Sequence, residues 1–244
     1  MADVKLLIDQ GNTRLKWVLA SDGEIDESSA GHGDLETFMQ ACRRDAEFHP
    51  SSVLLSSVAG GEDARALVDF CESRWGLKVQ NLESTEQRAG VRNAYREPKM
   101  LGVDRWLAIV GAVARHGKPV VIWDLGTATT IDAVDETGQH LGGMIYPGPA
   151  TMLDSLGRDT KLMVPANLEN SAVTPGRSTG SCISNGVYAA QVGALNQFLR
   201  NISEEMDGTA MLLVTGGAAS QILPRLDFEC IHDPWLVFRG MLVA

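Results

Sequence analysis

The chain has 244 residues, 44% of them hydrophobic and 21% charged, which excludes the disordered, collagen-like and membrane-spanning classes. A net charge of −10, without any run of five basic residues, argues against a nucleic-acid partner, so an anionic ligand must be held by a local site. The first apolar run is too short for a signal peptide, and no later run approaches the ~20 residues that span a bilayer. We therefore expect a globular, cytoplasmic protein without nucleic-acid or membrane partners. Its cysteines form no C-x-x-C pair and predict free thiols: Cys42, Cys71, Cys182 and Cys230.

The first predicted element is a strand, turn and strand unit near the start of the chain. Lys5–Ile8 is a short apolar run, Asp9–Asn12 has the composition of a turn, and Thr13–Ala20 places apolar residues on one face. The other elements of this half are one strand and two helices: Val53–Val58, Gly61–Trp75 and Asp104–Arg115. Gly117 and Pro119 then form a stop signal, so we expect a domain boundary near residue 116 and a first half spanning 1–116.

The strand, turn and strand unit is repeated at the head of the second half, 117–244. Val120–Trp123 is again apolar, Asp124–Thr127 again has turn composition, and Ala128–Val134 is rich in β-branched residues. Beyond them we expect a glycine-rich turn, two helices and a buried strand: Gly142–Gly148, a helix ending near Lys161, Ser181–Ile202 and Met211–Thr215. Hairpins at the head of both halves argue against an all-parallel Rossmann sheet and favour another α/β fold.

Both turns contain residues suited to binding phosphate. Glycine lets backbone N–H groups approach an anion, Thr and Asn add hydrogen bonds, and an Asp at the end of a strand can hold a cation. Asp9, Gly11, Asn12, Thr13 and Lys16 fit that role, although Asp, Gly and Asn also favour plain hairpin turns. Because we interpret the second turn as a copy of the same Asp-x-Gly-x-Thr unit, phosphate binding is favoured. The sequence has neither a Walker A motif nor a dinucleotide fingerprint, which favours ATP over NAD.

The paired hairpins resemble the two phosphate motifs of the acetate and sugar kinase, heat-shock protein and actin superfamily, and the whole chain resembles the type III pantothenate kinases. Five motifs carry this resemblance in order: residues 9–17, Tyr95 with 102–106, 124–132, 142–148 and 212–217. The resemblance implies an α/β fold that is actin-like (ribonuclease H-like), with duplicated mixed β-sheet domains and flanking helices. It also implies ATP-dependent phosphorylation of pantothenate to 4'-phosphopantothenate, the first step of coenzyme A biosynthesis, by a homodimer.

The same resemblance assigns roles to individual residues. ATP would be bound by Asp9, Gln10, Gly11, Asn12, Thr13, Arg14, Leu15 and Lys16, together with Thr127. Pantothenate would be bound by Tyr95, Gly102, Val103, Asp104, Arg105 and Thr179. Asp104 would be the catalytic base, and Asp124 would bind an activating monovalent cation, K+ or NH4+. Mg2+ would neutralise the phosphates.

Several of these residues also have a purely structural explanation. Asp104 is where the N-cap of the predicted helix belongs, but a carboxylate there also has its anionic form stabilised, so both roles can hold. Thr179 stands at a helix start and can serve as a cap. Arg105 is by default a solvated residue of the first turn, and Tyr95 a half-buried packing residue.

Two positions bear on how well the ligands are held. Asp124 follows an apolar strand, where an uncompensated charge is costly, and a bound cation would resolve this with help from Asp132 on the returning strand. Ala218 stands where the resembled family commonly has Asp, which removes one nucleotide contact. Two rival functions stay open: a non-catalytic regulator, and a different small-molecule kinase or ATPase of the same superfamily.

Overall fold

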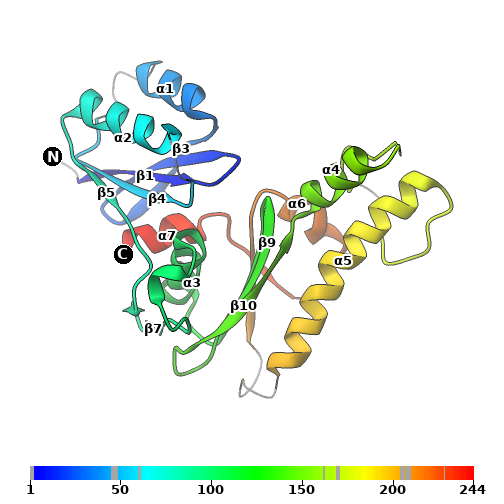
Figure 1. The fold of residues 1–244 in the computed structure, drawn as a ribbon. Coiled ribbons are helices and arrows are strands. Elements are labelled where there is room, and N and C mark those ends of the chain that lie inside the picture. Colours follow the sequence, from blue (N-terminus) through cyan, green and yellow to red (C-terminus); the bar gives the residue numbers. More distant parts are fainter. Residues whose placement is uncertain are drawn as a thin grey trace. The chain divides into compact units, whose positions relative to one another are not determined.

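The structure is a computed structural model and describes residues 3–44, 49–59, 62–161, 163–168, 171–203, 206, 210–227 and 229–244 (Figure 1). The chain divides into two compact units, Met1–His116 with Trp235–Ala244, and Gly117–Pro234. The main segment of the first unit ends at His116, near which we expected a boundary. Trp235–Ala244, however, lie with the first unit, whereas the sequence pattern assigned them to the second half, 117–244.

The first unit is built on a five-stranded mixed sheet in the order β3-β2-β1-β4-β5. The central strand β1 pairs antiparallel with β2 and parallel with β4, so the sheet has an antiparallel side and a parallel side. Its strands are β1 (Val4–Gln10), β2 (Leu15–Ser21), β3 (Glu24–Gly33), β4 (Ser52–Ser57) and β5 (Val79–Asn81).

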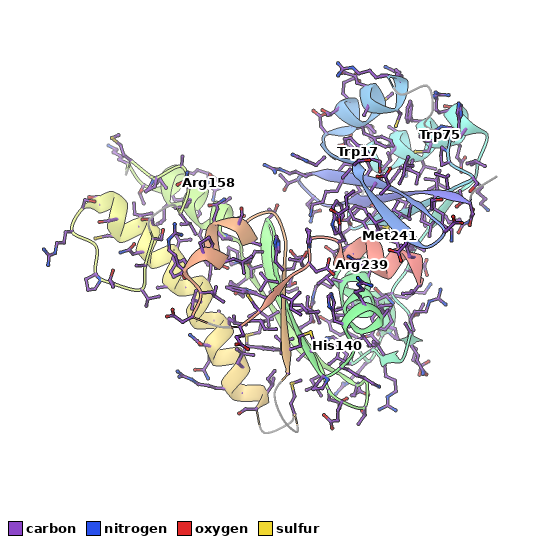
Figure 2. All side chains as sticks on the ribbon, turned by 180° about the vertical axis from the view of Figure 1, so that it is seen from behind. Trp17, Trp75, His140, Arg158, Arg239 and Met241 are labelled. Atoms are coloured by element: carbon purple, nitrogen blue, oxygen red, sulfur yellow. The ribbon has the colours of Figure 1, made fainter. Side chains whose placement is uncertain are left out.

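Helices cover both faces of this sheet (Figure 1). Helices α1 (Leu35–Arg44) and α2 (Glu62–Trp75) pack on the face that carries Leu6, Ile8 and Trp17. Helices α3 (Val103–His116) and α7 (Leu236–Leu242) pack on the opposite face, against Leu7 and Val18. Figure 2 shows Trp17 and Trp75 in the first of these layers and Met241 in the second. Gly61, the expected first residue of α2, lies outside the described residues.

The segment 82–102 connects β5 to α3. It contains the hairpin β6 (Gln87–Arg88) and β7 (Val91–Arg92) and the 3-10 helix η1 (Pro98–Met100). Val91 and Leu101 are buried, and the hydroxyl of Ser84 donates to the Leu101 carbonyl at 2.8 Å. These anchors fix the chain on both sides of Tyr95, just before α3 begins.

The second unit repeats the sheet of the first. Its order is β10-β9-β8-β11-β12, with β8 antiparallel to β9 and parallel to β11, as β1 is to β2 and β4. The strands are β8 (Val120–Leu125), β9 (Ala128–Val134), β10 (His140–Pro147), β11 (Met211–Thr215) and β12 (Ile231–His232). The duplication detected in two short hairpins therefore extends over a whole sheet.

Helices α4 (Pro149–Asp159) and α5 (Thr179–Ile202) pack on the face of this sheet that carries Trp123, Leu125 and Ile131. The short helices α6 (Ala219–Ile222) and η2 (Leu223–Arg225) follow β11. Among the helices of the described residues, none combines the length and the apolar character needed to cross a bilayer. The cysteines are free thiols, and burial raises the pKa of Cys71 to about 12, which makes it unreactive.

Some expected elements differ in the structure. The segment Gly142–Gly148, expected as a turn, largely belongs to the edge strand β10, because its backbone pairs with β9 and Gly142 absorbs an irregularity with φ +103°. The strand β3 and the helix α1 had no counterpart in the sequence prediction. β3 is mostly exposed and rich in Glu, Asp, Ser and Gly, so it lacks the apolar alternation that signals a strand.

The contact between α3 and α7 depends on two glycines. A Cβ added at Gly111 would overlap the Leu236 carbonyl and lie 2.6 Å from the Gly240 backbone nitrogen. A Cβ added at Gly240 would likewise overlap the backbone of Leu107. Bare backbones therefore meet at this crossing, which explains why Trp235–Ala244 pack on α3 and belong to the first unit.

We predict that Gly240→Ala lowers the free energy of unfolding by about 1–3 kcal/mol, because the added methyl forces α7 away from α3. Gly193→Ala is the matched control, since a Cβ there has no atom within 4 Å and sits in the interior of α5. That control should instead stabilise the protein by roughly 0.5–1 kcal/mol. Urea unfolding of both variants measures the difference, and equal stability of the two would contradict the close approach.

Candidate active site

The first hairpin brings a buried carboxylate to the end of a strand. Asp9 pairs with Lys16 across β1 and β2, and Gln10 pairs with Leu15, so residues 11–14 form the turn. The Gly11 amide donates to the Arg14 carbonyl at 3.0 Å and closes it. Alternation along β1 puts Asp9 on the face of Leu7, which α3 covers. The hydroxyl of Ser56, from the parallel strand β4, donates to Asp9 Oδ1 at 3.1 Å.

The residues expected to bind ATP from this hairpin fall into two groups. Asn12, Thr13, Arg14 and Lys16 are exposed, so their side chains can reach a ligand. The side chain of Leu15 instead belongs to the core beneath α1 and α2. Gln10 is also buried, and its Oε1 accepts from the Ser57 hydroxyl at 2.9 Å. For Gln10 and Leu15, the groups available to bind a phosphate are therefore those of the backbone.

The second hairpin has the same construction one residue shorter. Asp124 pairs with Thr130 and Leu125 with Thr129, so residues 126–128 form the turn, which the Gly126 amide closes on the Ala128 carbonyl at 3.1 Å. Asp124 is half-buried and Thr127 is exposed. Beside Asp124 lies Thr215 at the end of the parallel strand β11, as Ser56 lies beside Asp9.

This difference in length corrects the repeat as we interpreted it. Counted from the aspartate, the two copies do not match, because Thr13 lies four residues after Asp9 whereas Ala128 occupies that position after Asp124. The copies do match when positions are counted back from the residue that pairs with the aspartate. Lys16 pairs with Asp9 and Thr130 pairs with Asp124, and Thr13 and Thr127 lie equally far before these two residues. Thr13 and Thr127 are therefore equivalent in position relative to the strand that follows each turn, and not relative to the aspartate that precedes it.

The second turn is also held from outside the hairpin. The Thr127 carbonyl accepts from the Gly148 amide at 2.9 Å and from the Thr151 hydroxyl at 2.6 Å. Both donors come from the start of α4. On the other side, Gly216 follows β11 with φ +92°, and a Cβ there would overlap Asp124 Oδ1 and lie 2.6 Å from the Leu125 backbone. The turn is thus fixed between α4 and the end of β11.

Helix α3 begins one residue earlier than expected, which changes the position of Asp104. The Gly102 carbonyl accepts the first helical hydrogen bond, from the Trp106 amide at 2.9 Å, so Gly102 is the capping residue and Val103 opens the helix. Asp104 is therefore inside the first turn and is not the N-cap. Its Oδ1 accepts from the Arg105 amide at 2.8 Å, and the side chain is only partly buried.

Arg105 and Tyr95 form a pair. Arg105 is 7% exposed, contrary to the solvated position expected of it, and its Nη1 donates to the Tyr95 hydroxyl at 3.0 Å. The guanidinium carbon also lies 6.0 Å from the centre of the Tyr95 ring. Tyr95 is held in turn through its amide, which donates to the Asn93 side chain at 2.9 Å. The pair gives a guanidinium a fixed orientation next to Asp104.

The structure also changes the interpretation of Thr179 and Asp132. Thr179 is the first residue of α5 and is exposed, while Ser178 caps the helix and forms a capping box with Ser181. Asp132 is buried, and its Oδ1 lies 2.9 Å from Nε2 of the buried His140, so its carboxylate has a partner other than a cation at Asp124.

The described residues do not contain any group of three or more His, Cys, Asp or Glu side chains placed to hold a metal ion. A Mg2+ ion that is shared with phosphates needs only one or two protein carboxylates. Asp9 and Asp124 each offer one carboxylate at a strand end. The donor set therefore fits a cation that arrives with phosphate and not a closed metal cage.

Sequence reasoning missed the polar residues that support the two hairpins. Ser56 and Ser57 end β4 directly after an apolar run, and polar residues at the end of a buried strand next to β1 could have identified them. Gln191 is 0% exposed on the apolar face of α5, and Thr129 is equally buried. A glutamine between Tyr188 and Leu195 on an otherwise apolar face was the available signal.

Solved structures share this architecture. A Campylobacter jejuni protein assigned to the Baf family of transcriptional activators superposes with a TM-score of 0.61 at 22% identity, covering 97% of this chain and 94% of that one. The activator of the 2-hydroxyisocaproyl-CoA dehydratase from Clostridium difficile, solved with bound ADPNP, gives a TM-score of 0.53 at 13% identity, covering 100% and 92%. The fold is thus the duplicated, actin-like α/β fold, and the predicted fold class is confirmed.

Sequence comparison identifies the family within that class. The sequence model of the type III pantothenate kinases matches residues 5–201. A type III pantothenate kinase from Alcanivorax borkumensis is 33% identical over 239 residues, which cover 97% of this chain and 96% of the relative. The chain belongs to the type III pantothenate kinase family, as its motifs predicted.

We predict that Gly216→Ala lowers the free energy of unfolding by roughly 1–2 kcal/mol, because its backbone is left-handed and a Cβ has no room beside Asp124 and Leu125. Gly217→Ala is the matched control, since a Cβ at Gly217 has no atom within 4 Å. Thermal unfolding of the two variants checks this. An unchanged melting temperature for Gly216→Ala would show that the end of β11 is not constrained by the hairpin.

Proposed function

We propose that this protein transfers the γ-phosphoryl group of ATP to the hydroxyl of pantothenate, giving ADP and 4'-phosphopantothenate in the first step of coenzyme A biosynthesis. The observation that carries the proposal is membership of the type III pantothenate kinase family over nearly the whole chain. The two hairpins with buried or half-buried aspartates support it, because each offers a turn suited to phosphate. We place the reaction in the cytoplasm.

In this proposal the turns hold the nucleotide. The first hairpin, Asp9–Lys16, contributes backbone N–H groups and the exposed side chains of Asn12, Thr13 and Lys16, and the second contributes Thr127. Mg2+ on the phosphates would be held with the help of Asp9, and a monovalent cation, K+ or NH4+, by Asp124. When bound, these cations neutralise the charge of the transferring phosphoryl group. Ser56 and the closing hydrogen bonds keep the protein's own donors and carboxylates fixed before the ligand arrives.

Pantothenate would lie at the start of α3, in contact with Tyr95, Gly102, Val103, Asp104 and Arg105. Arg105 suits the carboxylate of pantothenate, because its buried guanidinium is oriented by Tyr95. Asp104 would accept the proton of the attacking hydroxyl while the oxygen bonds to the γ-phosphorus and the bond to ADP breaks. We further propose a homodimer, in which Thr179 also contacts pantothenate.

The proposal predicts that the purified protein releases ADP only when pantothenate is present with Mg2+, and faster when K+ or NH4+ replaces Na+. A coupled ADP assay with and without pantothenate measures this. A panel of other small alcohols and sugars in the same assay separates pantothenate kinase activity from that of a different kinase of the superfamily. ADP release that ignores pantothenate would sink the assignment.

Asp104→Asn should lower kcat by ~10²–10⁴-fold if the carboxylate accepts the hydroxyl proton, with little change in the KM for ATP. Asp63→Asn is the matched control, because Asp63 is also the second residue of a helix, α2, and is exposed. Both substitutions remove one negative charge from the first turn of a helix, so a difference in kcat between the two variants reports the catalytic role of Asp104. Wild-type turnover in Asp104→Asn would remove the base from the mechanism and leave the activity itself in place.

A further inference from the structure

A fully buried glutamine links helix α5 to the hairpin of the second unit. Gln191 is 0% exposed, and its Oε1 accepts from the hydroxyl of Thr129 at 2.8 Å. Its Nε2 donates to the carbonyl of Pro147 at 3.0 Å. Both arms of the side-chain amide therefore have partners, which is the condition for burying such a polar group without loss of stability.

These two partners lie on either side of the second turn. Thr129 is the first β9 residue paired across the hairpin, with Leu125, and directly follows the turn 126–128. Pro147 ends β10 and precedes Gly148, whose amide donates to the Thr127 carbonyl. One side chain of α5 thus holds both the segment that leaves the turn and the segment that supports it from α4.

Further buried hydrogen bonds surround this arrangement. The Tyr146 hydroxyl donates to the backbone carbonyl of Gln191 at 3.5 Å and accepts a hydrogen bond from the Trp123 indole at 3.1 Å. Burial raises the pKa of Tyr146 to about 12, so its hydroxyl keeps its proton at any working pH. Trp123, like Thr129, is 0% exposed.

We propose that Gln191 is a positioning residue for the phosphate-binding turn 126–128, holding Thr127 where the nucleotide requires it. The inference rests on the proposed function, in which Thr127 contacts ATP. Phosphoryl transfer depends mainly on positioning and charge neutralisation, and small displacements of a positioning group reduce the rate strongly. An apolar side chain could fill the same volume, but it could not both accept from Thr129 and donate to Pro147.

The variant Gln191→Glu tests this through a pH profile. A neutral glutamic acid is nearly isosteric with glutamine, and its carbonyl can accept from Thr129 while its O–H donates to Pro147. An ionised glutamate has no donor for the Pro147 carbonyl. Burial raises the pKa of such a group, to about 8–9 in documented cases, so the native arrangement is present below that pKa and is lost as pH rises through it.

We expect the KM for ATP and the Kd for ADP of Gln191→Glu to stay within about threefold of wild type near pH 6, and to rise about tenfold or more near pH 9. Gln197→Glu is the matched control, because Gln197 is an exposed residue of the same helix whose side chain donates to Asn201 one turn further along. It should follow the wild-type profile. Gln191→Met, which has no donor for Pro147 and does not titrate, should be impaired equally at both pH values.

A merely structural role gives a different result. If Gln191→Glu melts at a lower temperature but keeps the wild-type pH profile for both nucleotides, the positioning role is overturned. If this variant does not fold, Thr129→Val removes the hydroxyl while keeping the branched shape, and wild-type nucleotide affinity in that variant overturns the proposal equally. Calorimetric binding of ADP needs no pantothenate, so it tests the inference even if the kinase assay of the wild type fails.

Discussion

The arrangement of each unit depends on an acidic residue, Asp9 or Asp124, at the end of a buried strand. At this point a parallel strand lies beside it and a tight turn follows it. A carboxylate in that position is costly unless polar partners surround it. Ser56 supplies a hydroxyl beside Asp9, and the end of β11 leaves room only for glycine beside Asp124. Because parallel strands end at the same edge of a sheet, these partners come from distant parts of the chain. The two aspartates at these strand ends are the residues to which we assign the cations of the proposed reaction.

Helix α3 connects the stability of the first unit with its chemistry. Gly111 lets α7 approach the helix backbone, so the C-terminal segment completes the layer that covers the sheet. The other end of the same helix presents Asp104 and orients Arg105 through Tyr95. A helix that is packed on both sheet and backbone holds its first turn in place, as the roles proposed for Asp104 and Arg105 require.

In the second unit the support comes from further away. The turn that carries Thr127 is bonded to the start of α4, and the strand leaving it is bonded to the middle of α5. Alternation along β9 directs Thr129 toward the helices, while Asp124 and Thr130 face the other side of the sheet. One face of the hairpin thus carries Thr129, which bonds to α5, and the other carries Asp124, the proposed cation ligand, so the two roles do not compete for the same side chains.

The sequence by itself determined the hairpins at residues 9–16 and 124–130, the strands after them, the helix near Asp104 and the family, because these depend on local periodicity and on ordered motifs. It did not reveal that Trp235–Ala244 pack on α3, since that contact joins residues far apart in the chain through bare glycine backbones. The exposed strand β3 escaped detection because it lacks apolar alternation, and β10 because its glycines indicated a turn. Only tertiary structure decided which buried polar groups meet. Ser56 with Asp9, Arg105 with Tyr95, and Gln191 with Thr129 are pairs whose hydrogen bonds form between elements, and no spacing within one element encodes them.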